Sequence, residues 1–311
     1  MSKVKETIKI ILVVAVLAVG VFFGVNYLLH PQNESATTTP TTTKKTTAKK
    51  TPQKAKINLV AVGDSLTEGV GDESEGGYVG HIKKTLTTKQ KLKVTTTNAG
   101  KSGDRSDQIL ARINKSKVLQ QKIAKADVIT VTVGGNDLLQ TLEGSLTSNN
   151  TAKNNATVAK AQTLYANKLT KLFNKLQSLN GTASVFVFSI YNPIYVNFPN
   201  VTSITHYISQ WNDQTQTTVS QYKHTYFMDI NWTMSHGQYK TAAQIRKLKK
   251  AASATTLTSS KAITGALETE NKTNDLISTA DNFHPNKRGY RVFTTKLYQT
   301  MMAHDAWLIK K

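Results

Sequence analysis

The sequence has no cysteine among its 311 residues. This absence excludes disulfide bonds, thiolate metal sites and lipid-modified cysteine. Other metal-binding patterns are missing too, because no His-x-x-x-His pair is present and no carboxylate cluster suggests a metal. We therefore expect neither a bound metal nor a cofactor.

Acidic residues are scarce: 19 Asp and Glu face 40 Lys and Arg, giving a net charge of +21. Residues 1–56 hold nine lysines and two glutamates, so an excess of +14 remains on residues 57–311. Such a charge favours anionic surroundings such as phospholipid head groups, anionic wall polymers or nucleic acid. Zinc-finger spacing, RNP-like aromatic motifs and dense arginine clusters are all absent. We expect no nucleic-acid partner and favour an anionic cell-envelope surface.

The chain has one long hydrophobic run, the 20 uncharged residues 10–29. A helix of about 20 residues spans a bilayer core of about 30 Å. Lys3, Lys5 and Lys9 precede the run, whereas the next lysine after it is Lys44. This asymmetry predicts a transmembrane anchor with a cytoplasmic amino terminus and an extracellular remainder.

A cleaved signal peptide is the competing interpretation of residues 1–30, with Ala-Val-Gly at 18–20 as the cleavage site. The apolar run continues beyond that site, which favours the uncleaved anchor. Residues 31–56 are mostly Thr, Lys, Pro, Ala and Gln. They predict a disordered linker, because they can bury too little apolar surface to offset chain entropy.

From residue 57 onward, short apolar segments alternate with stretches of helical periodicity. The expected strands are 57–62, 92–97, 127–133, 184–190 and 225–230, and the expected helices are 105–125, 158–179 and 286–303. This alternation predicts a parallel sheet with helices on both faces. Residues 233–280 are polar and poor in strand signal, so we interpret them as an insertion within a domain spanning 57–311.

Unusual polar residues follow three of these expected strands. Ser65 comes after the first, in the sequence Gly-Asp-Ser-Leu at 63–66. The second is followed by Asn-Ala-Gly-Lys-Ser-Gly at 98–103, and the third by Gly-Gly-Asn-Asp at 134–137. Each motif has a plain structural reading as a turn, and Ser65 could simply cap the next helix. Strand ends of a parallel sheet nevertheless share one edge, where ligands bind.

The motif Asp-Asn-Phe-His-Pro at 281–285 supplies what a nucleophilic serine needs. His284 can take the proton from Ser65, and Asp281 can hold the imidazole in the required tautomer. The backbone N–H groups of Ser65 and Gly100 and the side-chain amide of Asn136 are candidate donors to an oxyanion.

With these four blocks in order, the chain resembles the SGNH/GDSL hydrolase superfamily, and most closely its membrane-anchored lipase/acylhydrolase-like members from Gram-positive bacteria. The resemblance implies a three-layer α/β/α flavodoxin-like fold, here preceded by one transmembrane helix. It also implies that Ser65, Asp281 and His284 form a catalytic triad, and that Ser65, Gly100 and Asn136 form the oxyanion hole. The Gly-x-Ser-x-Gly elbow of α/β-hydrolases is absent at Ser65.

The expected function is hydrolysis of carboxylic esters through an acyl-enzyme at the outer cell surface, on a small-molecule, lipid or acylated glycan ester. Two alternatives remain open. The first is a deacetylase of cell-wall polysaccharide, which the basic charge and the linker would suit. The second is a surface-binding module without catalysis, against which the intact set of Ser65, Asp281 and His284 argues.

Overall fold

The computed structural model describes residues 52–145, 151–252 and 274–310. The predicted membrane anchor at residues 10–29 and nearly all of the predicted linker lie outside these ranges. Within them, no helix combines the length and the hydrophobicity needed to cross a membrane.

The described residues contain one five-stranded sheet in the order β2-β1-β3-β4-β5, and every neighbouring pair is parallel. The strands are β1 (Lys56–Gly63), β2 (Lys93–Gly100), β3 (Val128–Val131), β4 (Ser184–Phe188) and β5 (Thr225–Met228). All residues of β3 and β4 are buried, as expected for central strands that are covered on both faces. In the edge strand β2 only Val94 is buried, and the other residues are partly or fully exposed.

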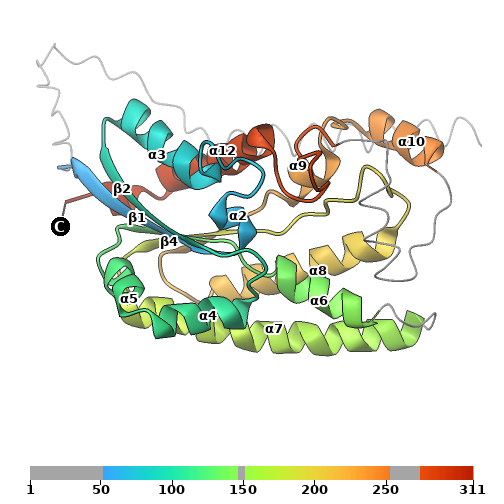
Figure 1. Ribbon diagram of the computed structural model, residues 1–311, viewed down its shortest axis with the longest axis horizontal. Helices are drawn as coiled ribbons and strands as arrows, with labels where there is room; N and C mark the ends of the chain where they lie inside the picture. The colour runs from blue at the N-terminus through green and yellow to red at the C-terminus, as the bar shows by residue number, and fades with distance from the viewer. Residues whose placement is uncertain (1–51, 146–150, 253–273, 311) are drawn as a thin grey trace, which may run out of the picture. The chain divides into compact units, whose positions relative to one another are not determined.

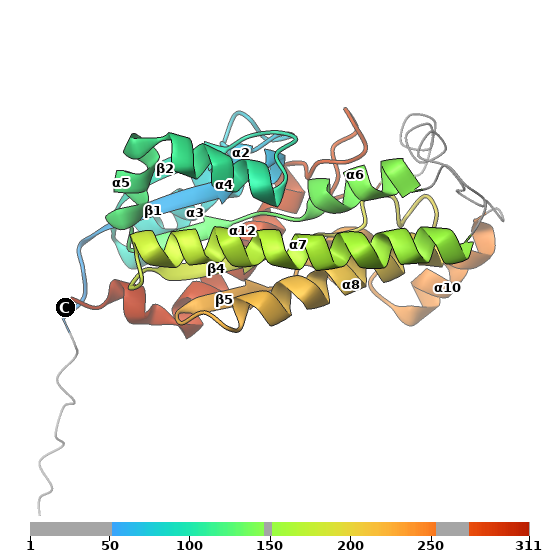
Figure 2. The same cartoon turned by 90° about the horizontal axis from the view of Figure 1, so that it is seen from below.

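Helices connect the strands and cover both faces of the sheet. They are α2 (Ser65–Glu68), α3 (Gly77–Gln90), α4 (Ser106–Lys115), α5 (Lys117–Ala124), α6 (Gly135–Ser145), α7 (Thr151–Leu179), α8 (Thr202–Val219), α9 (Asn231–His236), α10 (Ala242–Ala251) and α12 (Lys287–Ala303), followed by a short 3₁₀ helix, η1 (Asp305–Leu308). Figures 1 and 2 show α4 to α8 along one face and α3 and α12 along the other. The predicted three-layer α/β/α fold is confirmed.

Each face of the sheet has its own hydrophobic core. On one side, Ile109 of α4 and Leu172 of α7 are fully buried in the same cluster as Val131 of β3. On the other side, Ile82 of α3 and Phe293 of α12 belong to a second cluster, which includes Leu59 of β1. Burying both faces in this way holds the strand ends rigidly with respect to each other.

The chain order places a topological switch point at β1, because β2 lies on one side of β1 and β3 on the other. Ligands of doubly wound sheets bind at the carboxyl ends of the strands near such a point. Ser65 follows β1 directly, and Gly100 ends β2 opposite Gly63 in the parallel register. The second residue of α6, which follows β3, is Asn136.

Some boundaries differ from the sequence expectation. The folded unit already includes Gln53, which forms a bridge to Ile309, and Lys54, whose ammonium group lies 2.5 Å from Asp127. The expected helix at 105–125 is two helices, because Ser116 ends α4 and its side chain caps α5. Helix α7 begins at Thr151 rather than at 158.

The expected insertion at 233–280 is helical in α9 and α10, and its residues 253–273 lie outside the described part. Residues 274–280 pack into the fold, since Leu276 and Ile277 are buried.

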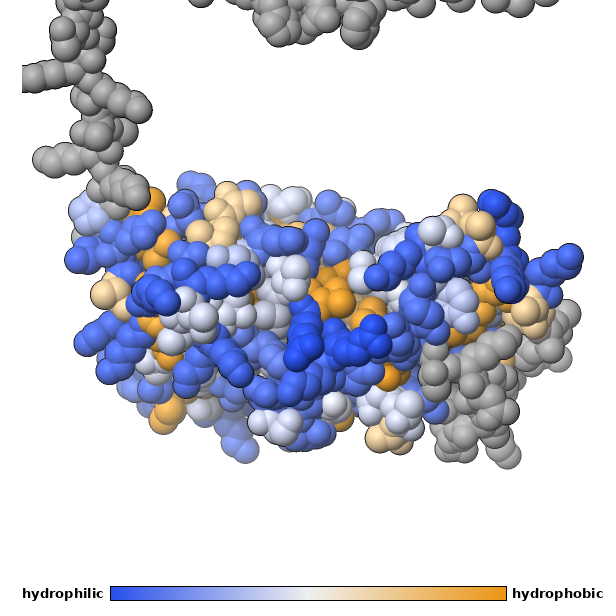
Figure 3. Space-filling view, turned by 90° about the horizontal axis from the view of Figure 1, so that it is seen from above, coloured by the Kyte–Doolittle hydropathy of each residue, from blue (hydrophilic) through white to orange (hydrophobic). Residues whose placement is uncertain are grey.

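Figure 3 shows that hydrophilic side chains cover most of the face that carries α3 and α12.

Candidate active site

A continuous chain of hydrogen bonds joins Ser65, His284 and Asp281. The Nε2 atom of His284 lies 2.8 Å from the Oγ atom of Ser65. On the other side of the ring, Nδ1 lies 2.5 Å from Oδ2 of Asp281. Ser65 is only 6% exposed, whereas the Asp281 side chain is 36% exposed. The fold thus brings together three side chains that lie up to 219 positions apart in the sequence.

Asp281 has the charge state that an imidazole-orienting group needs. Partial burial pushes its pKa upward, but this effect is outweighed by hydrogen bonds from the His284 ring and from the backbone N–H groups of Phe283 and His284. The pKa of Asp281 therefore lies below its ordinary value. An ionised carboxylate at Nδ1 leaves Nε2 as the nitrogen that can accept a proton from Ser65.

The loop that carries His284 is held from two sides. The backbone N–H of Ser278 donates to the carbonyl of His284 at 2.8 Å, and Ile277 forms a bridge to Pro285. Tyr191 lies in the segment that follows β4, and its hydroxyl donates to the backbone carbonyl of Phe283 at 2.8 Å. The segment 274–280, which sequence analysis assigned to an insertion, is therefore part of the support of His284.

The Ser65 turn rests on a buried polar network. Asp64 caps α2 through the Leu66 N–H and also accepts a hydrogen bond from Thr132 Oγ1 at 2.7 Å. Thr132 contacts Thr67, whose hydroxyl lies 2.9 Å from that of Tyr78. Burial raises the pKa of Asp64 above its ordinary value, against the lowering effect of these hydrogen bonds. Through these contacts, Asp64 holds the turn that carries Ser65.

Gly100 is fitted tightly against the Ser65 turn. A Cβ atom at this position would lie 2.1 Å from the backbone nitrogen of Glu68, so only glycine fits. The Gly100 N–H donates to Oδ1 of Asn98 at 2.9 Å, and the Asn98 amide in turn donates to the Thr67 carbonyl at 2.7 Å. An incoming oxyanion would compete with Asn98 for this N–H.

The amide of Asn136 is also held in place. Its Nδ2 atom donates to the backbone carbonyl of Asp104 at 3.0 Å. An amide nitrogen carries two hydrogens, and this bond uses one of them. Its neighbour Asp137 accepts from both the N–H and the hydroxyl of Ser106. The carboxylate of Asp137 thus ties the start of α6 to the start of α4, 31 residues earlier.

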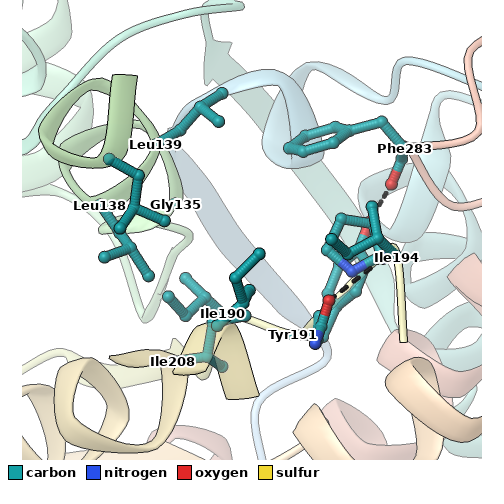
Figure 4. A pocket seen from close by; sticks show the side chains of 12 residues that line it. Gly135, Leu138, Leu139, Ile190, Tyr191, Ile194, Ile208 and Phe283 are labelled. Carbon is teal, nitrogen blue, oxygen red and sulfur yellow. Dashed lines mark hydrogen bonds between the residues drawn. The ribbon is translucent and has the colours of Figure 1, made fainter. Parts of the chain in front are cut away.

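An apolar pocket adjoins this site, with a cavity volume of about 80 Å³. Gly135, directly before Asn136, and Phe283, directly before His284, both line it. The remaining lining residues, almost all apolar, are Leu138, Leu139, Leu142, Ile190, Tyr191, Asn192, Pro193, Ile194, Ile204 and Ile208. In Figure 4, the α6 side chains face Phe283 and Ile194 across a common space.

Two titratable groups outside the triad have partners of their own. His81 lies 2.7 Å from Asp72. Asp107 pairs with Arg105 and Lys168 on the surface. In the part of the chain that the structure describes, no group of three His, Asp or Glu side chains is arranged to hold a metal ion.

Comparison with known proteins agrees with this geometry. A family model described as GDSL-like lipase/acylhydrolase matches residues 61–292, a span that includes Ser65, Gly100, Asn136, Asp281 and His284. The chain belongs to this family. This is a family of lipases and acylhydrolases, so the chain is a carboxylic ester hydrolase. The match confirms the resemblance to the SGNH/GDSL hydrolase superfamily that the four motifs indicated.

Two curated relatives come from Bacillus. The uncharacterized protein YpmR of Bacillus subtilis (strain 168) is 28% identical over 252 residues, which cover 81% of this chain and 84% of YpmR. The spore germination lipase LipC of Bacillus licheniformis is 42% identical over 88 residues, which cover 28% of this chain and only 41% of LipC.

Two solved structures share the fold. The lipase Lip_vut3 from a goat rumen metagenome has a TM-score of 0.57 at 24% identity, covering 78% of this chain and 96% of its own. A variant of Axe2, an acetyl-xylooligosaccharide esterase from Geobacillus, has a TM-score of 0.50 at 16% identity, covering 78% of this chain and 93% of its own. At these identities the similarity shows the fold alone.

Proposed function

We propose that the protein hydrolyses esters of fatty acids through an acyl-enzyme formed on Ser65. The observation that carries this proposal is the hydrogen-bond chain from Ser65 through His284 to Asp281. A serine hydroxyl becomes a good nucleophile only when a base removes its proton, and this chain supplies both the base and the group that orients it.

The reaction has two halves. In the first, Ser65 Oγ attacks the ester carbonyl carbon while its proton moves to Nε2 of His284. The tetrahedral intermediate collapses, the bond to the alcohol oxygen breaks, and the same proton passes from His284 to the departing alcohol. In the second half, water attacks the acyl-enzyme and gives a proton to His284. That proton returns to Ser65 Oγ as the carboxylic acid leaves.

Negative charge develops on the former carbonyl oxygen in both halves. The proposed donors to it are the N–H groups of Ser65 and Gly100 and the second amide hydrogen of Asn136. Losing one such donor typically costs about 3–4 kcal/mol of transition-state stabilisation. The tight fit of Gly100 and the held amide of Asn136 support this role, because donors act best when they are fixed before the reaction. The oxyanion would replace Asn98 Oδ1 as the acceptor of the Gly100 N–H.

The apolar pocket is evidence that the preferred substrate has an acyl chain longer than acetyl. Gly135 and Phe283 connect it to the oxyanion side and to the histidine side of the site, and its lining offers almost no polar partner. Each buried methylene group contributes about 0.8 kcal/mol of binding free energy. Such a pocket therefore binds a hydrocarbon chain favourably and adds little to the binding of an acetyl group. This favours a lipid-type ester over the acetyl group of a wall polysaccharide.

The proposed location is the outer face of the cell membrane. It is supported by the basic residues before the apolar run at 10–29 and by the net charge of +21, which suits an anionic envelope. Protease treatment of intact cells that carry the full chain would test it. Digestion of the catalytic domain in intact cells is the expected result, and full protection until lysis would contradict the location.

The reaction is tested with the full chain in detergent and a series of nitrophenyl esters from acetate to dodecanoate. We expect kcat/KM to rise from acetate to a maximum at a longer chain, and Ser65→Ala to abolish turnover while the protein stays folded. Activity confined to acetate would support the deacetylase instead. Undiminished turnover in Ser65→Ala would overturn the mechanism, and a folded protein without any esterase activity would favour a binding module.

A further inference from the structure

The side chain of Arg112, on α4, donates to three residues at the ends of two neighbouring strands of the proposed active site, β1 and β2. Its Nε atom donates to Oδ2 of Asp104 at 2.7 Å, and Nη1 donates to the backbone carbonyl of Ala99 at 2.8 Å. The third bond runs from Nη2 to the carbonyl of Gly63 at 2.9 Å. A planar guanidinium with several fixed donors can hold three acceptors in this way, whereas a lysine ammonium cannot reproduce the geometry.

The bond to Ala99 acts on the oxyanion donor of Gly100. The Ala99 carbonyl and the Gly100 N–H belong to the same planar peptide unit, in which they point in opposite directions. Fixing the carbonyl from one side therefore fixes the direction of the N–H on the other side. A hydrogen bond accepted by the carbonyl also polarises the peptide and strengthens its N–H as a donor.

The bond to Gly63 acts on the segment that carries the nucleophile. Gly63 is the last residue of β1 and stands two positions before Ser65. Its carbonyl also accepts the N–H of Lys101 at 3.1 Å, so Arg112 and the 98–103 loop share this acceptor. The guanidinium thereby fixes the end of β1 relative to the loop that follows β2.

The bond to Asp104 reaches the third donor indirectly. The Asp104 carboxylate is held by Arg112, and the backbone carbonyl of the same residue accepts the Asn136 amide. The Asp104 side chain is only 9% exposed and that of Arg112 26%, so water competes weakly for this ion pair. Through Asp104, the guanidinium determines where the Asn136 amide lies.

We infer that Arg112 is the positioning residue of the oxyanion hole, which sets the relative places of the Ser65, Gly100 and Asn136 donors without touching the substrate. This inference rests on the proposed hydrolase function. It deepens that function by assigning the alignment of all three donors to a single side chain on α4, a helix that none of the four sequence motifs includes.

The test compares Arg112→Met with the matched control Arg246→Met, which makes the same replacement at an exposed position on α10. Both are made in the full chain and assayed on the preferred nitrophenyl ester well below their melting temperatures. Removing a single oxyanion donor lowers kcat about 10²–10³-fold, and misaligning donors costs less. We expect kcat of Arg112→Met to fall about 30- to 100-fold, a smaller fall in Arg112→Lys, and no change beyond about twofold in the control.

A second readout separates positioning from loss of general stability. An alkyl trifluoromethyl ketone adds to the serine and places an oxyanion in the hole. Its inhibition constant should rise in Arg112→Met by about the factor by which kcat/KM falls, while KM for the ester stays within about threefold.

The inference is overturned if folded Arg112→Met keeps kcat within about threefold of the unchanged protein, or if kcat falls while the inhibition constant of the ketone does not change. Where Arg112→Met does not fold, the same two criteria apply to Arg112→Lys. Failure of the proposed hydrolase function would be seen separately, either as no esterase activity in the unchanged folded protein or as undiminished turnover in Ser65→Ala.

Discussion

Replacing Gly135 with valine should shorten the acyl pocket without disturbing the backbone. A Cβ atom at Gly135 would meet only the Cγ2 atom of Ile190, at an ordinary contact distance of 3.8 Å. Because both residues line the pocket, the new side chain extends into the space proposed for the acyl chain. The neighbouring Gly134 offers no such option, since its φ is +104° and a Cβ would lie 2.4 Å from the Tyr165 hydroxyl.

The expected size of the effect follows from the volume that valine adds. Its three carbons displace about two or three methylene groups of a bound chain. At about 0.8 kcal/mol each, this loss amounts to about 1.6–2.4 kcal/mol. Since about 1.4 kcal/mol corresponds to a factor of ten, kcat/KM for an octanoate ester should fall about 15- to 60-fold. The acetate ester does not reach the pocket and should change less than about twofold.

The assay is the octanoate-to-acetate ratio of kcat/KM for the purified full chain. Using a ratio cancels any general loss of active enzyme. Ile208→Phe narrows the same pocket from α8 and should lower the ratio independently. An unchanged ratio in both variants would refute the assignment of the pocket. If kcat/KM fell equally for both esters in Gly135→Val, the valine would be acting by displacing Asn136 rather than by shortening the space for the acyl chain.

Three further predictions concern the support of the site. Asp281→Asn should lower kcat about 10²–10⁴-fold with little change in KM, because the His284 tautomer is no longer fixed; unchanged kcat would contradict this. Gly100→Ala should destabilise the fold by about 1–3 kcal/mol in thermal unfolding, since its Cβ would lie 2.1 Å from the Glu68 nitrogen. Asp107→Asn should cost at most about 1 kcal/mol at neutral pH, because its ion pairs are partly exposed. The hydrogen bond from Arg105 lowers the pKa of Asp107 to about 2 from 3.8, so this difference should disappear in melts as the pH falls from 3.8 through about 2.

Much of the fold could be predicted because its central strands are almost continuously apolar. Segments such as 184–190 can only be buried on both faces, and their alternation with helices leaves a parallel sheet as the simple solution. The ends of the helices were harder to predict from the sequence. The first turns of α7, from Thr151, are polar and lack the apolar spacing that marks its later turns.

The candidate site could be predicted to the extent that its residues follow strand ends. Ser65, Gly100 and Asn136 each stand in a turn motif, and His284 lies in a short block with its partner Asp281. Parallel strands then bring these blocks to one edge, so linear order was enough to group them.

The supporting residues could not be predicted in the same way. Arg112 acts on backbone carbonyls, which every residue has, so no pattern in the sequence marks its acceptors. The acyl pocket is built from four segments whose apolar residues look like ordinary core. The link between Ser278 and His284 is a backbone hydrogen bond in a stretch that is polar by composition.

Covalent labelling of the full chain by an alkyl fluorophosphonate tests the central claim most directly. The probe loses fluoride on attack by an activated serine, and peptide mass spectrometry locates the adduct. We predict one adduct, on the peptide that contains Ser65, with labelling slowed strongly in His284→Ala and abolished in Ser65→Ala. A folded protein that does not label, or that labels equally well in Ser65→Ala, would contradict the account.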